Sequence, residues 1–271
     1  MYKIIKPDNN KNIISYIKEI YRFRSYILLF TKRDLKIKYA QTVLGVLWTL
    51  IQPIVGLIIF TYFFGKLINI GTDGSPYPVF VFPGIIAWYC FSFIVAYSGI
   101  SLIESQNLVK KIYFPKIILP ISKSLTSLTE LLIWFVILFA ILIIFNVTPG
   151  FKILFLPIFI LLNILTGLSI GIWLSALTYR FRDLIHIIPY LVGFSIFVTP
   201  VFYPVNIIPE NMNILIYMNP MAGVIQGYRW CIFEQADYSI KYLLGFGIMM
   251  SILLLGIKYF TKIDKKISDV I

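Results

Sequence analysis

Two charged side chains, Glu130 and Lys123, lie well inside an apolar stretch of this sequence and are the first candidates for chemistry. An ionisable residue within a membrane segment is costly and is usually functional. The two are seven residues apart, roughly 10 Å along a helix, which is too far for a direct ion pair. The ordinary alternative is that the hydroxyl-rich helix around them packs inside a bundle, with Glu130 hydrogen-bonded there. Both are retained as buried polar candidates, although one carboxylate alone is a poor proton relay.

Motifs for catalysis are missing from the sequence, which contains no Walker A motif, no paired-carboxylate motif and no Gly-x-Ser-x-Gly elbow. Its one histidine, His186, and its two cysteines, Cys90 and Cys231, do not suffice for a histidine zinc site or a disulfide framework. We therefore expect a protein that is not an enzyme, with no catalytic residue, metal or cofactor of its own. Any ATP and magnesium would be bound by a partner subunit.

The composition indicates a protein that crosses a membrane several times. The chain has 271 residues, of which 59% are hydrophobic and 13% are charged, whereas a soluble domain carries roughly 25% charged residues. The formal net charge of +12 would suggest a nucleic-acid partner in a soluble protein. Here the basic residues follow membrane topology instead, so we expect contact with membrane lipids and no nucleic acid.

Six segments are long and apolar enough to cross a membrane, which takes about 20 residues in a helix. We predict an all-α integral membrane protein with one domain over residues 1–271. The predicted spans are 39–66, 77–103, 117–146, 152–178, 185–203 and 239–260. The last one reaches spanning length only if Lys241 and Lys258 extend their charged ends to the two interfaces.

The charges of the connecting segments predict the orientation. Lys and Arg residues on the side of the two termini number 19, against 4 on the opposite side. Cytoplasmic loops carry the excess of basic residues, so both termini are predicted to lie in the cytoplasm. Residues 104–116 would then form a cytoplasmic loop and residues 261–271 a cytoplasmic tail.

Two of the segments outside the spans have patterns of their own. Apolar residues recur at helical spacing over residues 11–30, which predicts an amphipathic helix lying on the interface within a cytoplasmic segment 1–38. Thr31 and Asp34 have the spacing of a capping box, which predicts that a new helix begins there. Residues 204–238 combine prolines and asparagines with apolar clusters, and we expect short re-entrant helices at the outer mouth of a pathway.

Aromatic residues make up 17% of the chain and cluster in the first, second and fifth predicted spans. They could form an interfacial belt and lipid-facing bulk, or line a channel in which sugar rings slide over flat faces. The lining residues that we favour are Tyr62, Phe63, Tyr190, Phe194, Phe197 and Tyr203.

Basic residues precede the first and fifth spans, and they also have two interpretations. They could simply set the topology, or they could form an entrance that binds a diphosphate headgroup, for which arginine has suitable geometry. The entrance candidates are Arg33, Lys36, Arg180 and Arg182.

Three stretches of sequence resemble the membrane subunit of bacterial type-2 ABC exporters of cell-surface polysaccharide, the O-antigen and teichoic-acid exporter family. The first and most specific is RDLKIKYAQTVLGVLW at residues 33–48, followed by Gln52-Pro53. The second is YRFRDL at 179–184, leading to TPVFYP at 199–204. The third is Asn219-Pro220, followed by Tyr228-Arg229.

The resemblance implies an assembly with a second copy of this chain and two P-loop ATPase subunits, in the cytoplasmic (inner) membrane of a bacterium. It implies that a coupling helix contacts the ATPase through Glu104, Gln106, Asn107, Lys110 and Lys111. The substrate would be a polyprenyl-diphosphate-linked polysaccharide, with O-antigen expected first and teichoic acid or capsule as alternatives. A stand-alone, ion-driven flippase or carrier of lipid-linked sugars is the rival hypothesis, against which the lack of an inverted repeat argues.

Overall fold

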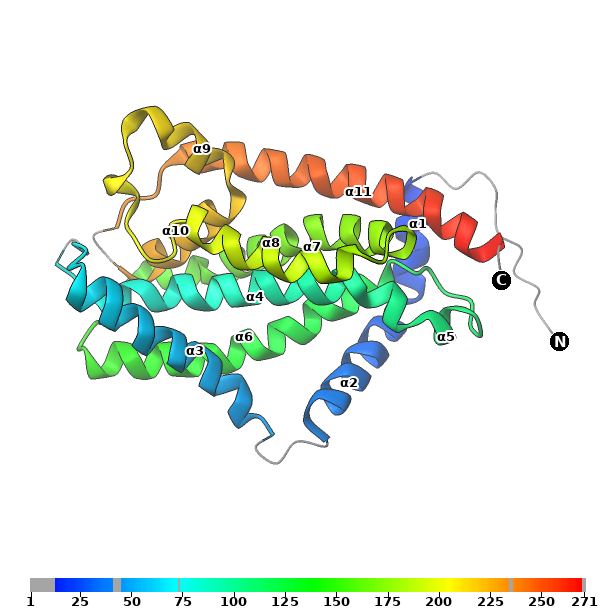
Figure 1. Cartoon of the computed structure of the whole chain (residues 1–271), viewed down its shortest axis with the longest axis horizontal. Helices are drawn as coiled ribbons and strands as arrows, with labels where there is room; N and C mark the ends of the chain where they lie inside the picture. Colours follow the sequence, from blue (N-terminus) through cyan, green and yellow to red (C-terminus); the bar gives the residue numbers. More distant parts are fainter. Residues whose placement is uncertain (1–12, 41–44, 73, 234–235, 270–271) are drawn as a thin grey trace.

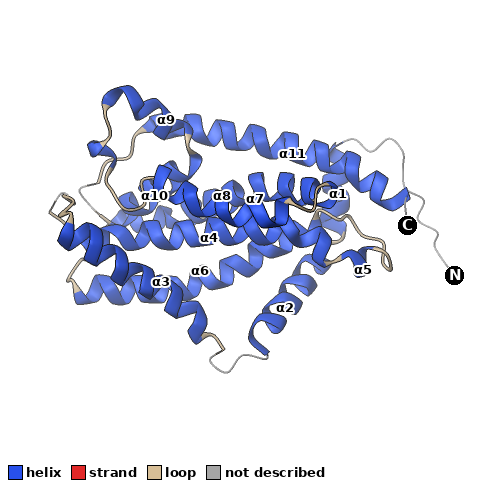
Figure 2. Ribbon diagram, in the orientation of Figure 1, coloured by secondary structure: helices blue, strands red, loops and turns tan. Residues whose placement is uncertain are grey.

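The computed structural model describes residues 13–40, 45–72, 74–233 and 236–269, and all the regular secondary structure in these ranges is helical (Figure 2). Most helices run along the long axis of the molecule (Figure 1). Within the described ranges, five helical segments are long and apolar enough to cross a membrane. They are α3 with η1 (Leu47–Phe60, Thr61–Leu67), α4 (Tyr77–Glu104), α6 (Ile118–Ile144), η2 with α7 (Phe151–Phe155, Leu156–Arg180), and η5 with α11 (Ile240–Tyr242, Leu243–Asp269).

The fifth predicted span coincides with a shorter helix, α8 (Leu184–Val198), of 15 residues. At 1.5 Å per residue it measures about 22 Å, less than the roughly 30 Å of a hydrocarbon core. A helical protein with several membrane-length helices is therefore confirmed, while the sixth crossing depends on α8 and the residues that follow it.

Helix α4 lies at the centre of the bundle and is buried along most of its length. It packs most closely against α7, where two glycines spaced four residues apart face it. A Cβ atom added to Gly167 would lie 2.8 Å from the Ile94 Cβ, and one added to Gly171 would lie 2.7 Å from the Ser98 Cβ. Small residues at this spacing let two membrane helices approach closely, so these glycines set the distance between α4 and α7.

The N-terminal region forms two helices, α1 (Ile13–Arg22) and α2 (Arg24–Ala40). The predicted helix start at Thr31 is wrong, because α2 runs through this position without a break. The Thr31 hydroxyl is buried against α6 and donates to the Ile27 carbonyl at 2.8 Å and to the Ser122 carbonyl at 3.2 Å. The Thr31 hydroxyl therefore links α2 to α6 and does not cap the start of a helix.

The first span also begins later than the sequence predicts. Residues 39 and 40 belong to the end of α2, and α3 begins at Leu47 after a turn in which Gly45 has a φ of +50°. Glycine adopts a positive φ without the steric cost that most residues pay, so Gly45 suits the turn that precedes α3. Positions 41–44 of the resemblance motif lie outside the described residues.

Residues 204–238 contain short helices, as expected. They are η3 (Val205–Ile207), η4 (Glu210–Met212), α9 (Asn213–Met218) and α10 (Pro220–Ile232). Asn219 caps α10, because its side-chain oxygen accepts a hydrogen bond from the Met221 amide at 3.0 Å. Figure 1 shows α9 and α10 at one end of the bundle, while α1 and the short α5 (Gln106–Val109) lie at the other.

Candidate translocation surface and charged network

Two helices, α3 and α8, present apolar and aromatic faces that the rest of the chain leaves uncovered. Both pack on α4, on either side of it in Figure 1. On α8 the exposed large hydrophobic side chains recur every three or four residues, which is the spacing of one helix face. They are Ile187, Tyr190, Leu191, Phe194, Phe197 and Val198. Among the predicted lining residues, Tyr190 and Phe194 are about 70% exposed, and Tyr62 and Phe63 of η1 are about half exposed.

An aromatic cluster joins these two helices at the end near α10. Phe202, which follows α8, stacks on Phe60 with ring centroids 3.9 Å apart and on Phe64 at 5.4 Å. The predicted lining residue Tyr203 turns back toward α8, because its hydroxyl donates to the Phe197 carbonyl at 3.2 Å. The structure therefore joins the ends of η1 and α8 through Phe60, Phe64 and Phe202, while the predicted lining residues Tyr62 and Phe63 remain exposed.

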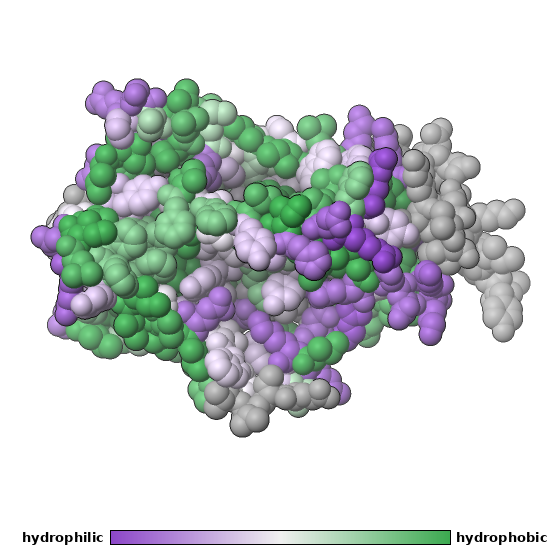
Figure 3. Space-filling view, viewed as in Figure 1, coloured by the Kyte–Doolittle hydropathy of each residue, from purple (hydrophilic) through white to green (hydrophobic). Residues whose placement is uncertain are grey.

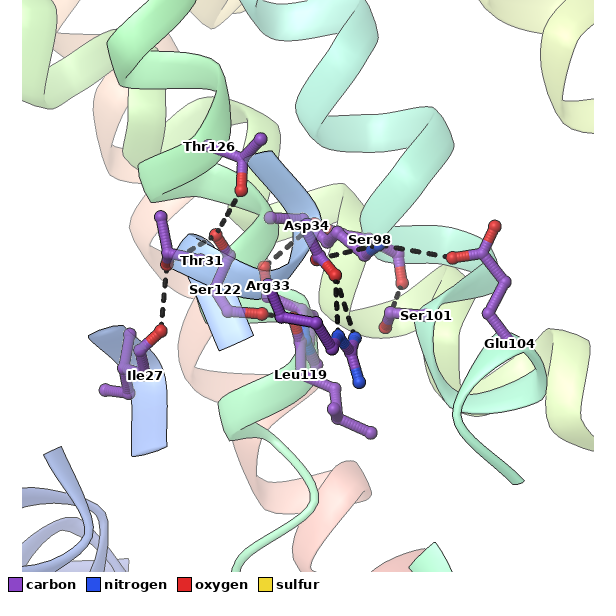
Figure 4. A network of polar contacts seen from close by, with 12 residues as sticks. Ile27, Thr31, Arg33, Asp34, Ser98, Ser101, Glu104, Leu119, Ser122 and Thr126 are labelled. Carbon is purple, nitrogen blue, oxygen red and sulfur yellow. Dashed lines mark hydrogen bonds and ion pairs between the residues drawn. The ribbon is translucent and has the colours of Figure 1, made fainter. Parts of the chain in front are cut away.

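A charged network lies toward the other end, where α2 meets α4 and α6 (Figure 4). The Lys123 ammonium is 2.9 Å from an Asp34 carboxylate oxygen and 3.2 Å from one of Glu104. Arg33 donates to the other Asp34 oxygen, at 2.8 Å from Nη2 and 3.0 Å from Nε. The network thus contains two cations and two carboxylates, and it holds α2 against both membrane helices.

Glu130, deeper in α6, has a different partner. It is only 2% exposed and forms an ion pair with Lys38 of α2. The Lys38 ammonium also lies 4.7 Å above the ring of Phe93. Glu130 and Lys123 are both buried but pair with different residues of α2, so each carries its own contact between α2 and α6.

A cavity of about 490 Å³ opens beside this network. Its charged lining includes Arg33, Lys38, Lys123 and carboxylates of both Asp34 and Glu104. Because cations and carboxylates alternate around it, the cavity is not the uniformly positive pocket expected for a diphosphate.

The four entrance candidates are dispersed. Arg33 is held by Asp34, whereas Lys36, Arg180 and Arg182 are exposed. The Arg180 guanidinium lies 5.1 Å above the ring of its neighbour Phe181. A headgroup would therefore meet these side chains on an open surface and not in a preformed pocket.

The coupling candidates lie in and beside α5, at the end opposite α10 (Figure 1). Asn107, Lys110 and Lys111 are exposed and Gln106 is half-buried. Glu104 differs from them, since it belongs to the charged network through Lys123. Figure 3 shows hydrophilic surface gathered toward this end, while hydrophobic surface predominates over the opposite half of the same face, apart from hydrophilic patches at its far edge.

A polar clamp that the sequence did not indicate joins α1, α11 and the segment before α6. The Tyr16 hydroxyl donates to Asp264 at 2.8 Å, and the Lys116 ammonium lies 3.0 Å from the same carboxylate. Burial, together with the negative charge of Asp264, raises the pKa of Tyr16 well above its ordinary value, so the tyrosine remains a neutral donor. The clamp places α1 and the end of α11 on the same side of the bundle.

Arg229 on α10 is one of the four basic residues counted on the side opposite the termini, and it is only 2% exposed. Its guanidinium donates to the carbonyls of Phe80, Pro200 and Val201 at 3.2, 3.0 and 2.7 Å. Arg229 therefore fixes the loop after α8 to the start of α4. In the sequence, only the Tyr228-Arg229 motif drew attention to Arg229.

The described chain is thus a membrane-embedded helical bundle with an uncovered aromatic side and a charged end, an arrangement suited to a transport subunit. Residues 25–233 match the profile of the ABC-2 type transporter family, and the chain belongs to this family. This confirms the resemblance found in the sequence motifs. The permease subunits of these transporters have no ATP site of their own, and the ATPase is a separate subunit.

Relatives with assigned names cover most of the chain. It is 25% identical over 244 residues to the O-antigen export system permease protein RfbA of Myxococcus xanthus, with 89% of this chain and 93% of that protein aligned. An O-antigen export system permease protein RfbA of Klebsiella pneumoniae is 24% identical, with 90% and 94% aligned. The polysialic acid transport protein KpsM of Escherichia coli is 25% identical, with 80% and 86% aligned.

Proposed function

We propose that this chain is the channel-forming subunit of an ATP-driven exporter that moves a polyprenyl-diphosphate-linked polysaccharide across the bacterial cytoplasmic membrane. O-antigen is the proposed cargo, with teichoic acid or capsule as the alternatives. The family membership and the names of the relatives, which refer to O-antigen export and polysialic acid transport, support this assignment.

The uncovered aromatic faces of α3 and α8 are the observation that carries the proposal. Six helices of one chain are too few to enclose a polymer, but a second copy related by a two-fold axis would close a channel between the two faces. Flat aromatic rings suit a polymer because stacking tolerates changes of register. The proposed lining is Tyr62, Phe63, Tyr190, Phe194, Phe197 and Tyr203.

Six crossings with both ends in the cytoplasm are part of the proposal. The Tyr16–Asp264 hydrogen bond supports it, since this contact brings the end of α11 to the side of α1. The two ends of a chain lie on the same side of a membrane only if the chain crosses it an even number of times. Helix α8, extended by the residues up to 203, would supply the sixth, and residues 204–238 would act as short gating helices on the outer side.

The charged end would face the cytoplasm and the ATPase. We assign coupling to Gln106, Asn107, Lys110 and Lys111, with Glu104 transmitting motion through Lys123 to α2. The entrance candidates Arg33, Lys36, Arg180 and Arg182 would receive the diphosphate headgroup on the open surface, because arginine pairs with phosphate in a bidentate manner. ATP and magnesium would be bound by the partner.

Purification of the tagged chain from its native membrane in mild detergent, followed by mass spectrometry, tests the assembly. We expect a stoichiometric partner that carries a P-loop. In the same strain, deletion of this chain should abolish surface polysaccharide and leave lipid-linked glycan inside the cell. A lone chain that moves lipid-linked sugar in liposomes without ATP would contradict the proposal and favour the ion-driven carrier.

A further inference from the structure

A second cavity, of about 610 Å³, lies at the end of the bundle where α9 and α10 are found. Its volume is within the range of about 300–1,000 Å³ that small-molecule sites occupy. Segments from five parts of the chain converge on it. Its polar lining includes Thr72, Thr148, Asn206, Gln226 and Asp237, and Phe80 and Phe233 supply aromatic surface.

The electrostatics of this cavity favour an uncharged ligand. Arg229 belongs to the lining, and three of the five N–H groups of its buried guanidinium donate to backbone carbonyls. Its positive charge is balanced in the same lining by the carboxylate of Asp237. Asp237 supplies one carboxylate to the same lining, which would repel an anionic group. Hydroxyl, amide and carboxylate groups beside an aromatic ring are suited to a ligand with many hydroxyl groups.

Some of the lining side chains have unused hydrogen-bonding capacity. Within the described parts of the chain, the side chains of Thr148, Gln226 and Asp237 form no hydrogen bond or ion pair with protein groups. Gln226 is half-buried on α10, next to the rigid anchor that Arg229 provides. A polar side chain on a fixed helix can be matched by ligand hydroxyls at little entropic cost.

The cavity is also placed next to the aromatic faces. Thr72 follows η1, the continuation of α3, and Asn206 lies in the segment that follows α8. A polymer that leaves the space beside these two helices would reach this cavity at their ends.

We propose that this cavity is a carbohydrate-binding subsite that holds neutral sugar units of the exported glycan as they leave the channel. The proposal rests on the proposed function, since it takes the cargo to be a polysaccharide. Hydrogen bonds from Thr148 and Gln226, with Phe233 beneath the sugar ring, restrain the emerging polymer from slipping back between transport cycles.

Cysteine labelling in spheroplasts of the native strain, with the whole exporter present, tests the subsite. Cys90 and Cys231 are both buried, so a membrane-impermeant maleimide reports on an introduced cysteine. The test position is Thr148→Cys, and the matched control is Asn211→Cys, which is exposed on η4 and outside the lining. The probe is a mixture of neutral oligosaccharides released by mild acid from the surface polysaccharide of the same strain.

We expect the oligosaccharides to slow labelling at Thr148→Cys about tenfold when they are present at about ten times their Kd, since an occupied site is protected. Labelling at Asn211→Cys should be unchanged. Addition of Gln226→Leu, which has nearly the same shape but no amide, should remove the protection. Three results would each overturn the subsite. They are equal labelling rates with and without sugar at Thr148→Cys, equal protection at both positions, and protection that survives Gln226→Leu.

The same strain separates this result from a failure of the proposed function. If deletion of the chain leaves surface polysaccharide intact, the cargo assignment fails. If deletion abolishes surface polysaccharide and Thr148→Cys is not protected, the subsite alone is wrong.

Discussion

Lys38 and Glu130 form an ion pair that no local pattern could have revealed, because they are 92 residues apart. Glu130 is almost completely buried, and loss of its partner would leave a charge in apolar surroundings. Replacement of Lys38 by Met should therefore lower the free energy of unfolding by about 1–3 kcal/mol. Thermal unfolding of the detergent-purified protein measures this loss.

Lys36→Met is the matched control, because Lys36 lies on the same helix and is exposed. Its melting temperature should stay close to that of the unchanged protein. Glu130→Gln should restore most of the stability lost in Lys38→Met, since it removes the unpaired charge. If Lys38→Met and Lys36→Met melt alike, the ion pair does not stabilise the protein.

At the scale of helices, the contact between α4 and α7 depends on glycine. Gly171→Ala would place a Cβ atom 2.7 Å from the Ser98 Cβ, so the two helices must separate or distort. We expect a loss of about 1–3 kcal/mol, as is typical of an overpacked core. The control is Gly193→Ala on α8, where an added Cβ meets no atom within 4 Å. Unfolding temperatures that fall equally for both variants would show that α4–α7 packing is not the cause.

The aromatic faces of α3 with η1 and of α8 yield a second prediction at this scale. Stacking of a ring-shaped ligand on an aromatic side chain contributes about 1–3 kcal/mol. The triple variant Tyr62→Ala, Phe194→Ala and Phe197→Ala should therefore lower export about tenfold or more, while the three exposed positions leave the fold intact. Surface polysaccharide is the measurement, and recovery of the intact complex is its control. Normal export by the triple variant would show that these residues do not line the channel.

For the whole molecule, the proposed channel requires two copies that face each other through α8. Tyr190→Cys should be joined to the same residue of the second copy by a bis-maleimide long enough to cross the channel, and give a band of twice the 31.4 kDa chain mass. Leu161→Cys is the control, because Leu161 is exposed on α7, away from α8's exposed stripe. Cross-linking at Leu161 and not at Tyr190 would place the interface between copies on α7, and would contradict the proposed channel.

Hydropathy and charge predicted the long helices well, since a membrane imposes length and apolarity on every helix that crosses it. The short helices of residues 204–238 were also expected from prolines and asparagines. The capping box at Thr31 was wrong because tertiary packing against α6 overrode a local pattern. The burial of Arg229 could not be predicted, because burial follows from the whole fold.

The candidate site was only partly foreseeable for the same reason. Aromatic content indicated the first and fifth predicted spans, because it can be read from neighbouring residues in the chain, but it did not indicate which face of each helix is exposed. The partners of Lys123 and Glu130 lie on α2, at a sequence distance over which spacing carries no information. Identification of Glu104 as part of the network likewise required the three-dimensional arrangement of α4 and α6.

The clamp between Tyr16 and Asp264 has a consequence for how the protein is made. Its two residues are 248 positions apart, so at about 5–20 residues per second the ribosome takes roughly 12 to 50 s to supply the second after the first. Throughout that interval the insertion machinery holds a bundle in which α1 has no α11 to dock on. A chain that ends before α11 cannot form this contact, and it leaves the Tyr16 hydroxyl without the carboxylate to which it donates.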